Sequence, residues 1–365
     1  MSTTDTNSMT HSTHSSKLKL DAEEAIKKLL SEIPFVEEVR INTKNKEYGF
    51  DLHGLVSIGS KKYKLIIDVS SSGQPLTTRN TIAIWENWKR LKALKDCFFV
   101  IISPYMSETS RNLCKESDVG FLDLTGNCHL CFGHIYIERF GFKHETEKRE
   151  LVSIFQEKAS RTIRRLLTEP KRNWFVHELA SEARVSNGLA SQVKKKILQS
   201  EIGEELDGTF FLTKPELLLK QWGEAYRFNK NKQLQLYSEK PLSEVERQLA
   251  NYCHENAIEY AFTLNSAARL IGAQYVSVIN RSHCYVSGSA DAIAKALDLK
   301  TVNSGGNFVL LTAFDDDLLF NKRLVNETTV VSDIQLYLDF AAQTGRTQET
   351  AEIILDSRIK MAWRV

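Results

Sequence analysis

The sequence lacks any apolar run that could span a membrane, which in a helix takes about 20 consecutive apolar residues. Residues 1–16 are rich in Ser and Thr and contain neither the apolar core of a secretory signal nor the arginines of a transit peptide. We therefore expect a cytoplasmic protein with no membrane partner. Low apolar content also predicts a disordered tail over residues 1–18.

The chain also has little net charge, because 48 Lys and Arg side chains nearly balance 46 Asp and Glu side chains and leave +2. A nucleic-acid partner therefore cannot be inferred from the total and must be sought in local charge. Between residues 151 and 232 there are fifteen basic and ten acidic residues. The positive charge is thus concentrated in the middle of the chain.

The six cysteines are unevenly spaced and do not form the framework of a disulfide-rich protein. Cys128 and Cys131, near His134 and Cys114, suggest part of a zinc site, but no second cysteine pair follows at a structural-zinc spacing. Residues 127–138 have the pattern of a β-hairpin. We therefore predict reduced, buried thiols in a hairpin, with no metal and no cofactor.

The middle of the chain predicts a winged helix-turn-helix over residues 150–232. Apolar spacing indicates helices over 159–167 and 176–183, and a tight turn at 184–187 leads into a third helix. A hairpin over 205–212 follows, because its Asp-Gly pair readily adopts the positive φ of a type I′ turn. Such a module binds DNA, and the alternative is a linker domain of the same shape.

The third helix is the predicted DNA-recognition element, because its polar residues fall on the side opposite Leu189, Val193 and Ile197. Base-edge contacts are predicted for Ser191, Gln192 and Lys195. Phosphate contacts are predicted for Arg184, Ser186, Lys194 and Lys196.

The first helix carries a basic face, whereas the hairpin carries acids that phosphate would repel, namely Glu204, Glu205 and Asp207. We therefore expect the wing to contribute little to DNA binding.

Residues 19–145 predict a mixed α/β domain with helices on the faces of a sheet. Helices are expected at 22–30, 77–94 and 107–117, and strands at 35–41, 48–58, 63–69, 98–102 and 120–123.

This order resembles the PD-(D/E)xK nuclease superfamily, a restriction-endonuclease-like fold that binds a divalent metal. Asp51 and Asp68 match its acidic positions, but Ser70 stands where the family has a lysine. Lys64 could in principle reach the acids. We therefore predict an inactive nuclease-like domain, with a metal-dependent DNA nuclease as the alternative.

A polar linker at 229–233 is expected to precede a C-terminal α+β domain over residues 236–365. The pattern predicts helices at 242–256, 264–271, 290–297, 334–342 and 347–363, and strands at 275–279, 283–286 and 307–311. Three consecutive acids at 315–317 are expected to form a solvated turn. From residue 290 onward eleven acids stand against eight bases, a balance that suits a protein partner better than DNA.

The chain after its tail resembles the longer AbiEi-type antitoxins of type IV toxin-antitoxin systems. The resemblance rests on residues 68–75 (DVSSSGQP), 123–127 (DLTGN) and 331–339 (VSDIQLYLD), together with the winged helix. It implies a non-enzymatic bacterial regulator in phage defence. Its partners would be promoter DNA with inverted repeats and a nucleotidyltransferase-like toxin encoded beside it.

Overall fold

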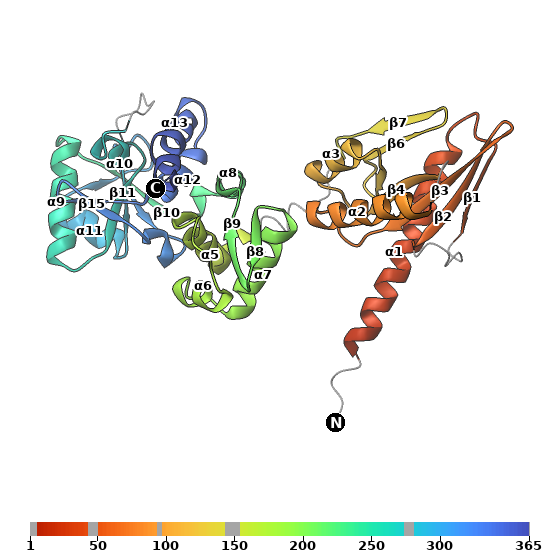
Figure 1. The fold of residues 1–365 in the computed structure, drawn as a ribbon. Coiled ribbons are helices and arrows are strands. Elements are labelled where there is room, and N and C mark those ends of the chain that lie inside the picture. Colours follow the sequence, from red (N-terminus) through yellow and green to blue (C-terminus); the bar gives the residue numbers. More distant parts are fainter. Residues whose placement is uncertain (1–5, 43–49, 93–96, 143–153, 274–280, 365) are drawn as a thin grey trace. The chain divides into compact units, whose positions relative to one another are not determined.

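A computed structural model describes residues 6–42, 50–92, 97–142, 154–273 and 281–364 (Figure 1). The chain divides into two compact units: an N-terminal unit of residues 1–150 with 197–201, and a C-terminal unit of residues 151–196 with 202–365. Within the described residues, no helix combines the length and the apolar character that crossing a membrane requires.

The N-terminal unit contains one sheet in which strands β1 to β7 lie side by side in chain order. The central strands β3, β4 and β5 are parallel, and the outer pairs on both sides are antiparallel. The strands are β1 (Glu38–Asn42), β2 (Leu52–Ile58), β3 (Lys61–Val69), β4 (Cys97–Ser103), β5 (Gly120–Asp123), β6 (Cys128–Phe132) and β7 (Ile135–Arg139).

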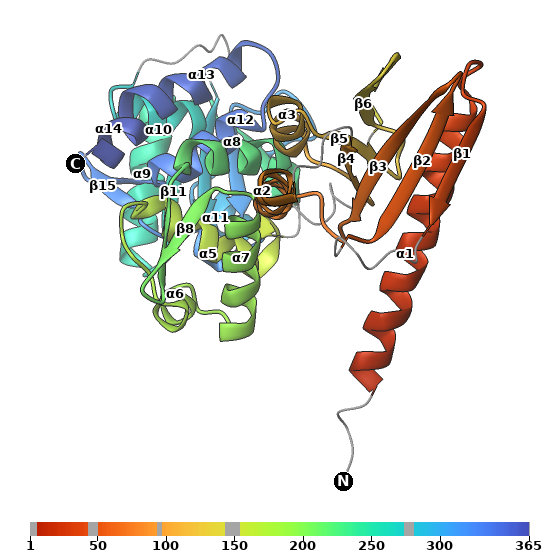
Figure 2. The ribbon, with the colours of Figure 1, turned by 45° about the vertical axis from the view of Figure 1, so that its right-hand side comes forward.

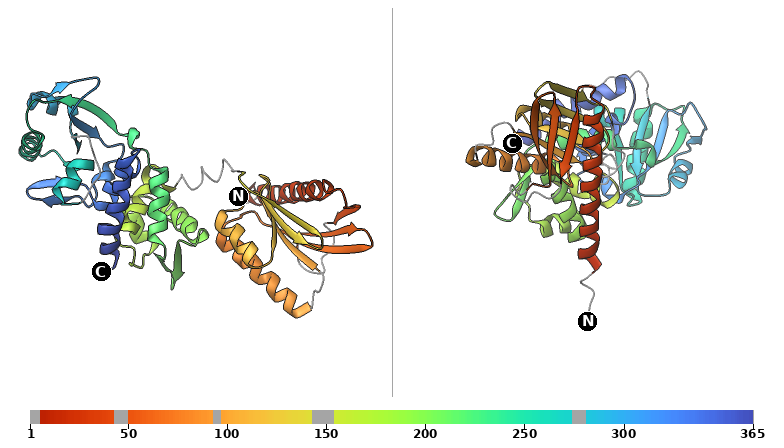
Figure 3. Two further views of the ribbon diagram at one scale, coloured as in Figure 1. Left: turned by 90° about the horizontal axis from the view of Figure 1, so that it is seen from above. Right: turned by 90° about the vertical axis from the view of Figure 1, so that its right-hand side faces the viewer.

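Helices cover both faces of this sheet (Figure 3). Helix α1 (Thr6–Ser31) contributes Ile26 and Leu30 to a core that includes Leu65 of β3. On the other face, α2 (Pro75–Lys92) places Trp85 in a second core, where its ring stacks on Phe99. Helix α3 (Glu108–Glu116) lies beside α2. Successive apolar residues of β3 and β4 thus point alternately into the two cores, and the mixed sheet predicted for this region is confirmed.

Helix α1 extends farther toward the N-terminus than the helix predicted over residues 22–30 (Figure 2). It begins at Thr6 and includes much of the stretch for which disorder was predicted. The packed turns around Ile26 supply a nucleus, and adding residues to an existing helix costs far less than starting one.

The C-terminal unit begins with three helices and a hairpin, here called the helix-hairpin region (residues 157–212). Trp174 and Phe210 exchange two backbone hydrogen bonds, which tie the loop before the second helix to the hairpin. Asp207 and Gly208 have φ of 50° and 79°, as predicted for the turn. The elements are α5 (Glu157–Thr168), α6 (Val176–Glu182), α7 (Asn187–Gln199), β8 (Gly203–Leu206) and β9 (Thr209–Leu212), and α8 (Pro215–Ala225) follows. The predicted order of elements is therefore confirmed.

The rest of this unit is a second mixed sheet with the strand order β13-β10-β14-β12-β11-β16-β15. The strands are β10 (Lys232–Tyr237), β11 (Tyr260–Thr263), β12 (Ser282–Val286), β13 (Lys300–Thr301), β14 (Phe308–Thr312), β15 (Arg323–Val325) and β16 (Thr328–Val330). The helices are α9 (Leu242–Glu255), α10 (Leu264–Leu270), α11 (Ala290–Ala296), α12 (Asp333–Ala341), α13 (Arg346–Ile354) and α14 (Lys360–Arg364). Short helical turns are η1 (Phe228–Lys230), η2 (Asp316–Leu319) and the π-helical η3 (Leu355–Ile359). The strand predicted at 275–279 lies outside the described residues.

The linker predicted at 229–233 is wrong. Strand β10 starts at Lys232, and Asn231 is only 3% exposed. The amide group of its side chain donates to the Tyr285 hydroxyl and its oxygen accepts the Phe314 amide N–H. These partners are distant in sequence, so Asn231 is buried although its neighbours Lys230 and Lys232 are exposed. Residues 202–365, which include this connection and the second sheet, belong to one compact unit.

Candidate nucleic-acid interface

Helix α7 separates a buried apolar face from an exposed polar face. Val193 and Ile197 are buried, at 1% and 0% exposure. Ser191, Gln192 and Lys195, the three residues predicted to contact bases, are all exposed. The structure thus places these side chains on one accessible surface, since positions 191, 192 and 195 are helical neighbours.

The turn before α7 holds two of the residues predicted to contact phosphate. Ser186 is the N-cap, because its hydroxyl oxygen accepts the Leu189 amide N–H at 3.3 Å. Arg184 is exposed and has a φ of 53°, in the left-handed region that a side chain with a Cβ disfavours. The chain therefore keeps an arginine at a position whose backbone would favour glycine.

Substituting glycine at Arg184 should separate folding from DNA binding. We expect Arg184→Gly to raise the free energy of unfolding by about 0.5–1 kcal/mol, because the relief of left-handed strain exceeds glycine's entropic cost. DNA affinity should fall at the same time if the guanidinium contacts phosphate. Urea denaturation and a gel shift on one preparation would check both, and a variant of lower stability would contradict the strain argument.

The two remaining predicted phosphate contacts are only partly accessible. The Lys194 ammonium lies 2.6 Å from Glu205 of β8 and above the Phe210 ring. Lys196 is half-buried. An acid of the hairpin thus neutralises one of the cations on α7, so Lys195 is the lysine of this helix that is best exposed.

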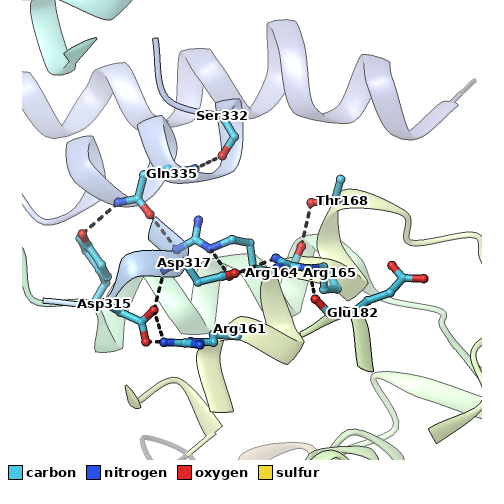
Figure 4. A network of polar contacts seen from close by, with 10 residues as sticks. Arg161, Arg164, Arg165, Thr168, Glu182, Asp315, Asp317, Ser332 and Gln335 are labelled. Carbon is cyan, nitrogen blue, oxygen red and sulfur yellow. Dashed lines mark hydrogen bonds and ion pairs between the residues drawn. The ribbon is translucent and has the colours of Figure 1, made fainter. Parts of the chain in front are cut away.

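The basic face of α5 binds the acidic segment at 315–317 (Figure 4). The Arg165 guanidinium donates to both carboxylate oxygens of Asp317, at 2.6 and 3.0 Å. Arg161 makes a similar double contact with Asp315, at 2.9 and 3.0 Å. The Asp317 side chain is 7% exposed. The solvated turn predicted for residues 315–317 is therefore wrong for Asp315 and Asp317, although Asp316 is exposed.

Arg164 lies at the centre of this contact and is buried, at 5% exposure. Its guanidinium donates to the Gln335 side-chain oxygen at 2.8 Å and lies over the Trp222 ring. Burial lowers the pKa of this guanidinium, and Asp317 opposes the shift. Gln335 in turn donates to Asp339 of α12. One polar chain therefore runs from the helix-hairpin region into the core of the second sheet.

Asp339 is a buried carboxylate that gathers four donors. It accepts hydrogen bonds from the hydroxyl groups of Tyr226, Thr263 and Tyr285 and from the Gln335 amide. Burial raises its pKa to about 6, and the four hydrogen bonds oppose this shift. The cluster leaves this carboxylate no exposed surface. Asp339 therefore has a structural role, since its hydrogen bonds hold α8, α12 and the sheet around one buried carboxylate.

Sequence reasoning missed these buried arginines because charge was taken as a sign of exposure. Positions 161, 164 and 165 form one stripe on α5, and they are interleaved with the buried Ile163 and Leu166. Two acids separated by one residue at 315 and 317 provide the matching pattern. These two patterns were the available signal.

The predicted nuclease positions lie at one end of β3 in the N-terminal unit. Asp51 accepts the Val69 amide N–H at 2.9 Å, and the Lys19 ammonium of α1 lies 2.5 Å from its other oxygen. Burial and the nearby Asp51 charge raise the pKa of Asp68 to about 6. The hydroxyl of Ser70 donates to the Ser72 carbonyl, a local turn contact. The cation beside the acids thus comes from Lys19, while Lys64 is exposed on β3.

Segments 68–75 and 123–127 meet at the carboxyl ends of β3, β4 and β5. The Asp123 carboxylate accepts the amide N–H groups of Met106, Thr125, Gly126 and Asn127. A Cβ at Gly73 would lie 2.1 Å from the Tyr105 carbonyl oxygen, so only glycine allows this approach. Both segments therefore have a structural role, because they connect the carboxyl ends of the three parallel strands.

The raised pKa of Asp68 predicts how the N-terminal unit responds to pH. The folded state favours the protonated acid, so this stabilisation is complete below the ordinary pKa of 3.8 and is lost as pH rises through about 6. The loss should reach up to about 3 kcal/mol. Hydrogen exchange of β3 amides at pH 4 to 7.5 should show this loss in the wild type and not in Asp68→Asn. Identical pH profiles of the two proteins would contradict the assignment.

The cysteines of the β6–β7 hairpin do not all behave as predicted. Cys128 and Cys114 are buried, and burial raises the pKa of the Cys114 thiol to about 12. Cys131 is exposed, because residues three apart on a strand point to opposite faces. Among the described residues, no three His, Cys, Asp or Glu side chains come together as a metal site.

Comparison with known proteins concerns the C-terminal unit. Residues 211–360 match the family model described as "Transcriptional regulator, AbiEi antitoxin, Type IV TA system". The matched region starts in β9 and ends in α14, so it includes the acids that bind α5 and excludes α7. No curated protein and no solved structure matches the chain.

Proposed function

We propose that this chain, whose residues 211–360 belong to the AbiEi family of antitoxins and transcriptional regulators of type IV toxin-antitoxin systems, represses its own operon. In this proposal the helix-hairpin region is a winged helix-turn-helix that binds inverted repeats in the promoter. The second sheet and its helices would counter a nucleotidyltransferase-like toxin encoded in the same operon.

The observation that carries the proposal is the accessible polar face of α7. Ser191, Gln192 and Lys195 are exposed together, while the opposite face of the helix is buried. A helix with this division fits the major groove, where serine, glutamine and lysine can each contact base edges. The family match supports a regulator, and the exposed face supports DNA as its ligand.

Helix α5 would not contact DNA in this proposal, because its arginines are bound to Asp315 and Asp317. The hairpin would contribute little, because Glu205 is paired with Lys194 and Glu204 is exposed beside it. Binding would therefore depend on few phosphate contacts, and its salt dependence should be modest for a DNA-binding protein.

A gel shift with the DNA upstream of the gene would test the proposal. The protein should bind this fragment more tightly than a scrambled fragment of the same composition, and binding should weaken as salt rises. Equal affinity for both fragments would contradict the proposal that the protein recognises a specific operator sequence. A reporter fused to the promoter should then show whether the bound protein represses transcription.

We further propose that the N-terminal unit has no nuclease activity. Its Asp51 carboxylate is engaged by the Val69 amide N–H and by Lys19, and Ser70 replaces the family lysine. Purified protein should leave plasmid DNA intact in magnesium and in manganese. Cleavage that disappears in Asp68→Ala would instead establish the metal-dependent nuclease.

A further inference from the structure

A groove of roughly 600 Å³ lies between α8, α12 and α13 in the C-terminal unit. Among its lining residues, the buried Gly223 and Tyr337 and the half-buried Ala341 are here called its floor. The exposed Glu224, Glu349 and Glu352 are here called its edges. A Cβ at Gly223 would be 3.1 Å from the Tyr337 ring and 3.3 Å from Ala341. Glycine therefore lets α8 approach α12 closely and keeps the floor open.

The groove carries a negative charge that its own residues only partly balance. Three exposed carboxylates line it together with the single ammonium of Lys220. This ammonium lies 3.0 Å from Glu216 and 3.7 Å from Glu352. Among the described side chains, none forms an ion pair with Glu224 or Glu349. The excess of carboxylates in the groove thus favours a cationic ligand.

Tyr337 adds a polar hydroxyl group to the groove. Its side chain belongs to a residue that is only 3% exposed, yet its hydroxyl group has no hydrogen-bond partner among the described residues. Burial raises the pKa of this phenol, and the charges of Glu352, Glu224 and Glu216 raise it further. The hydroxyl group therefore stays protonated, and its oxygen remains free to accept a hydrogen bond from a ligand.

We propose that this groove binds an arginine side chain on a basic segment of the protein partner. The guanidinium has five N–H donors in a flat fork, which suits carboxylates at the edges and a hydroxyl oxygen at the floor. A divalent metal fits less well, because no three metal-ligating side chains converge among the described residues. The identity of the partner as the toxin rests on the proposed function, whereas the chemistry of the ligand does not.

A peptide pair that differs only in charge would test the site on the full-length protein. The probe is a fluorescein-labelled arginine-glycine peptide, and its control replaces arginine with the neutral isostere citrulline. Fluorescence anisotropy should show at least tenfold tighter binding of the arginine peptide. Equal binding of the two peptides would overturn the proposal.

Three variants would then locate the binding. Glu349→Gln with Glu352→Gln should weaken the arginine peptide at least tenfold, and Tyr337→Phe should weaken it several-fold without changing the charge. The matched control Glu255→Gln with Asp291→Asn removes two exposed acids elsewhere on this unit and should have no effect. An equal loss in the control would show general charge attraction and overturn the site.

The same variants separate this site from the proposed regulation. All of them should still shift promoter DNA, because none lies on α7. If the wild type binds the arginine peptide and fails to shift DNA, the groove stands and the proposed function fails. If the wild type shifts DNA and does not bind the arginine peptide, the proposed function stands and the groove proposal fails.

Discussion

Replacing Asp317 with alanine should lower the free energy of unfolding of the C-terminal unit by about 3–5 kcal/mol. The variant would leave the buried guanidinium of Arg165 without its two charge-assisted hydrogen bonds and would remove the nearest anion from Arg164. An uncompensated buried charge is among the largest single costs that a substitution can impose. Chemical denaturation followed by tryptophan fluorescence would measure it, since Trp174 and Trp222 lie in this unit.

Asp316 provides the matched control for this measurement. It is the same residue type one position away, but it is exposed, so Asp316→Ala should change stability by no more than about 0.5 kcal/mol. Asp315→Ala should fall between the two, because its pair with Arg161 is less buried. Equal effects of Asp316→Ala and Asp317→Ala would contradict the buried ion pair.

A double substitution separates the cost of an orphaned charge from the value of the pair itself. Asp317→Ala combined with Arg165→Met should recover part of the lost stability, because the second change removes the unpaired cation and keeps apolar volume. The Arg165 guanidinium also lies 3.3 Å from the centre of the Phe320 ring, a contact that methionine can partly replace. A double variant less stable than Asp317→Ala alone would mean that the arginine contributes mainly through packing.

The contact between α5 and residues 315–317 links the helix-hairpin region to the second sheet. The first helix of the helix-hairpin region is held to the second sheet through Asp315, Asp317 and Gln335. At the other end of α5, the Trp363 indole N–H donates to the Leu167 carbonyl oxygen. A protein that binds the second sheet therefore contacts a body that is continuous with α7, and Asp317→Ala should loosen the two parts.

Elements with strong periodicity could be predicted from the sequence. Runs of apolar and β-branched residues predicted strands such as β3 and β4, and the spacing at Val193 and Ile197 predicted the buried face of α7. The Asp-Gly pair at 207 and 208 gave the hairpin turn. These features depend on neighbours in the chain, so local reasoning was enough.

Features that depend on distant partners could not be predicted in this way. Asn231 is polar in the sequence and buried in the fold, because Tyr285 and Phe314 supply its hydrogen bonds. Arg164 looks like a surface residue but is only 5% exposed, because Gln335 and Trp222 pack against it. Lys19 meets Asp51 only when α1 packs on the sheet. In each case the deciding contact spans many residues of sequence.

The candidate DNA interface likewise has features that follow from local spacing and a contact that depends on a distant partner. The exposure of Ser191, Gln192 and Lys195 follows from helical spacing and was predicted. The pairing of Lys194 with Glu205 was missed, because it requires the hairpin to return to α7. Of the seven residues predicted for the interface, Ser191, Gln192 and Lys195 therefore form the exposed surface of α7. Arg184 is exposed in the turn before this helix.

Gln192→Ala combined with Lys195→Ala should weaken binding to the promoter fragment by about 2–4 kcal/mol, since each good base contact is worth about 1–3 kcal/mol. Both side chains are exposed, so the variant should fold normally and unfold at the wild-type urea concentration. The matched control is Gln233→Ala with Lys232→Ala, which removes the same two side-chain types from exposed positions on β10.

The gel shift should be run on the promoter and on a scrambled fragment with all three proteins. Loss of base contacts should reduce the preference for the promoter and leave weak, salt-dependent binding to the scrambled fragment nearly intact. A mainly electrostatic role for Lys195 would weaken both fragments alike and reduce the salt slope by about 1. Promoter affinity unchanged in the α7 variant, or lost equally in the β10 control, would remove α7 as the recognition helix, and the exposed polar face would then need another ligand.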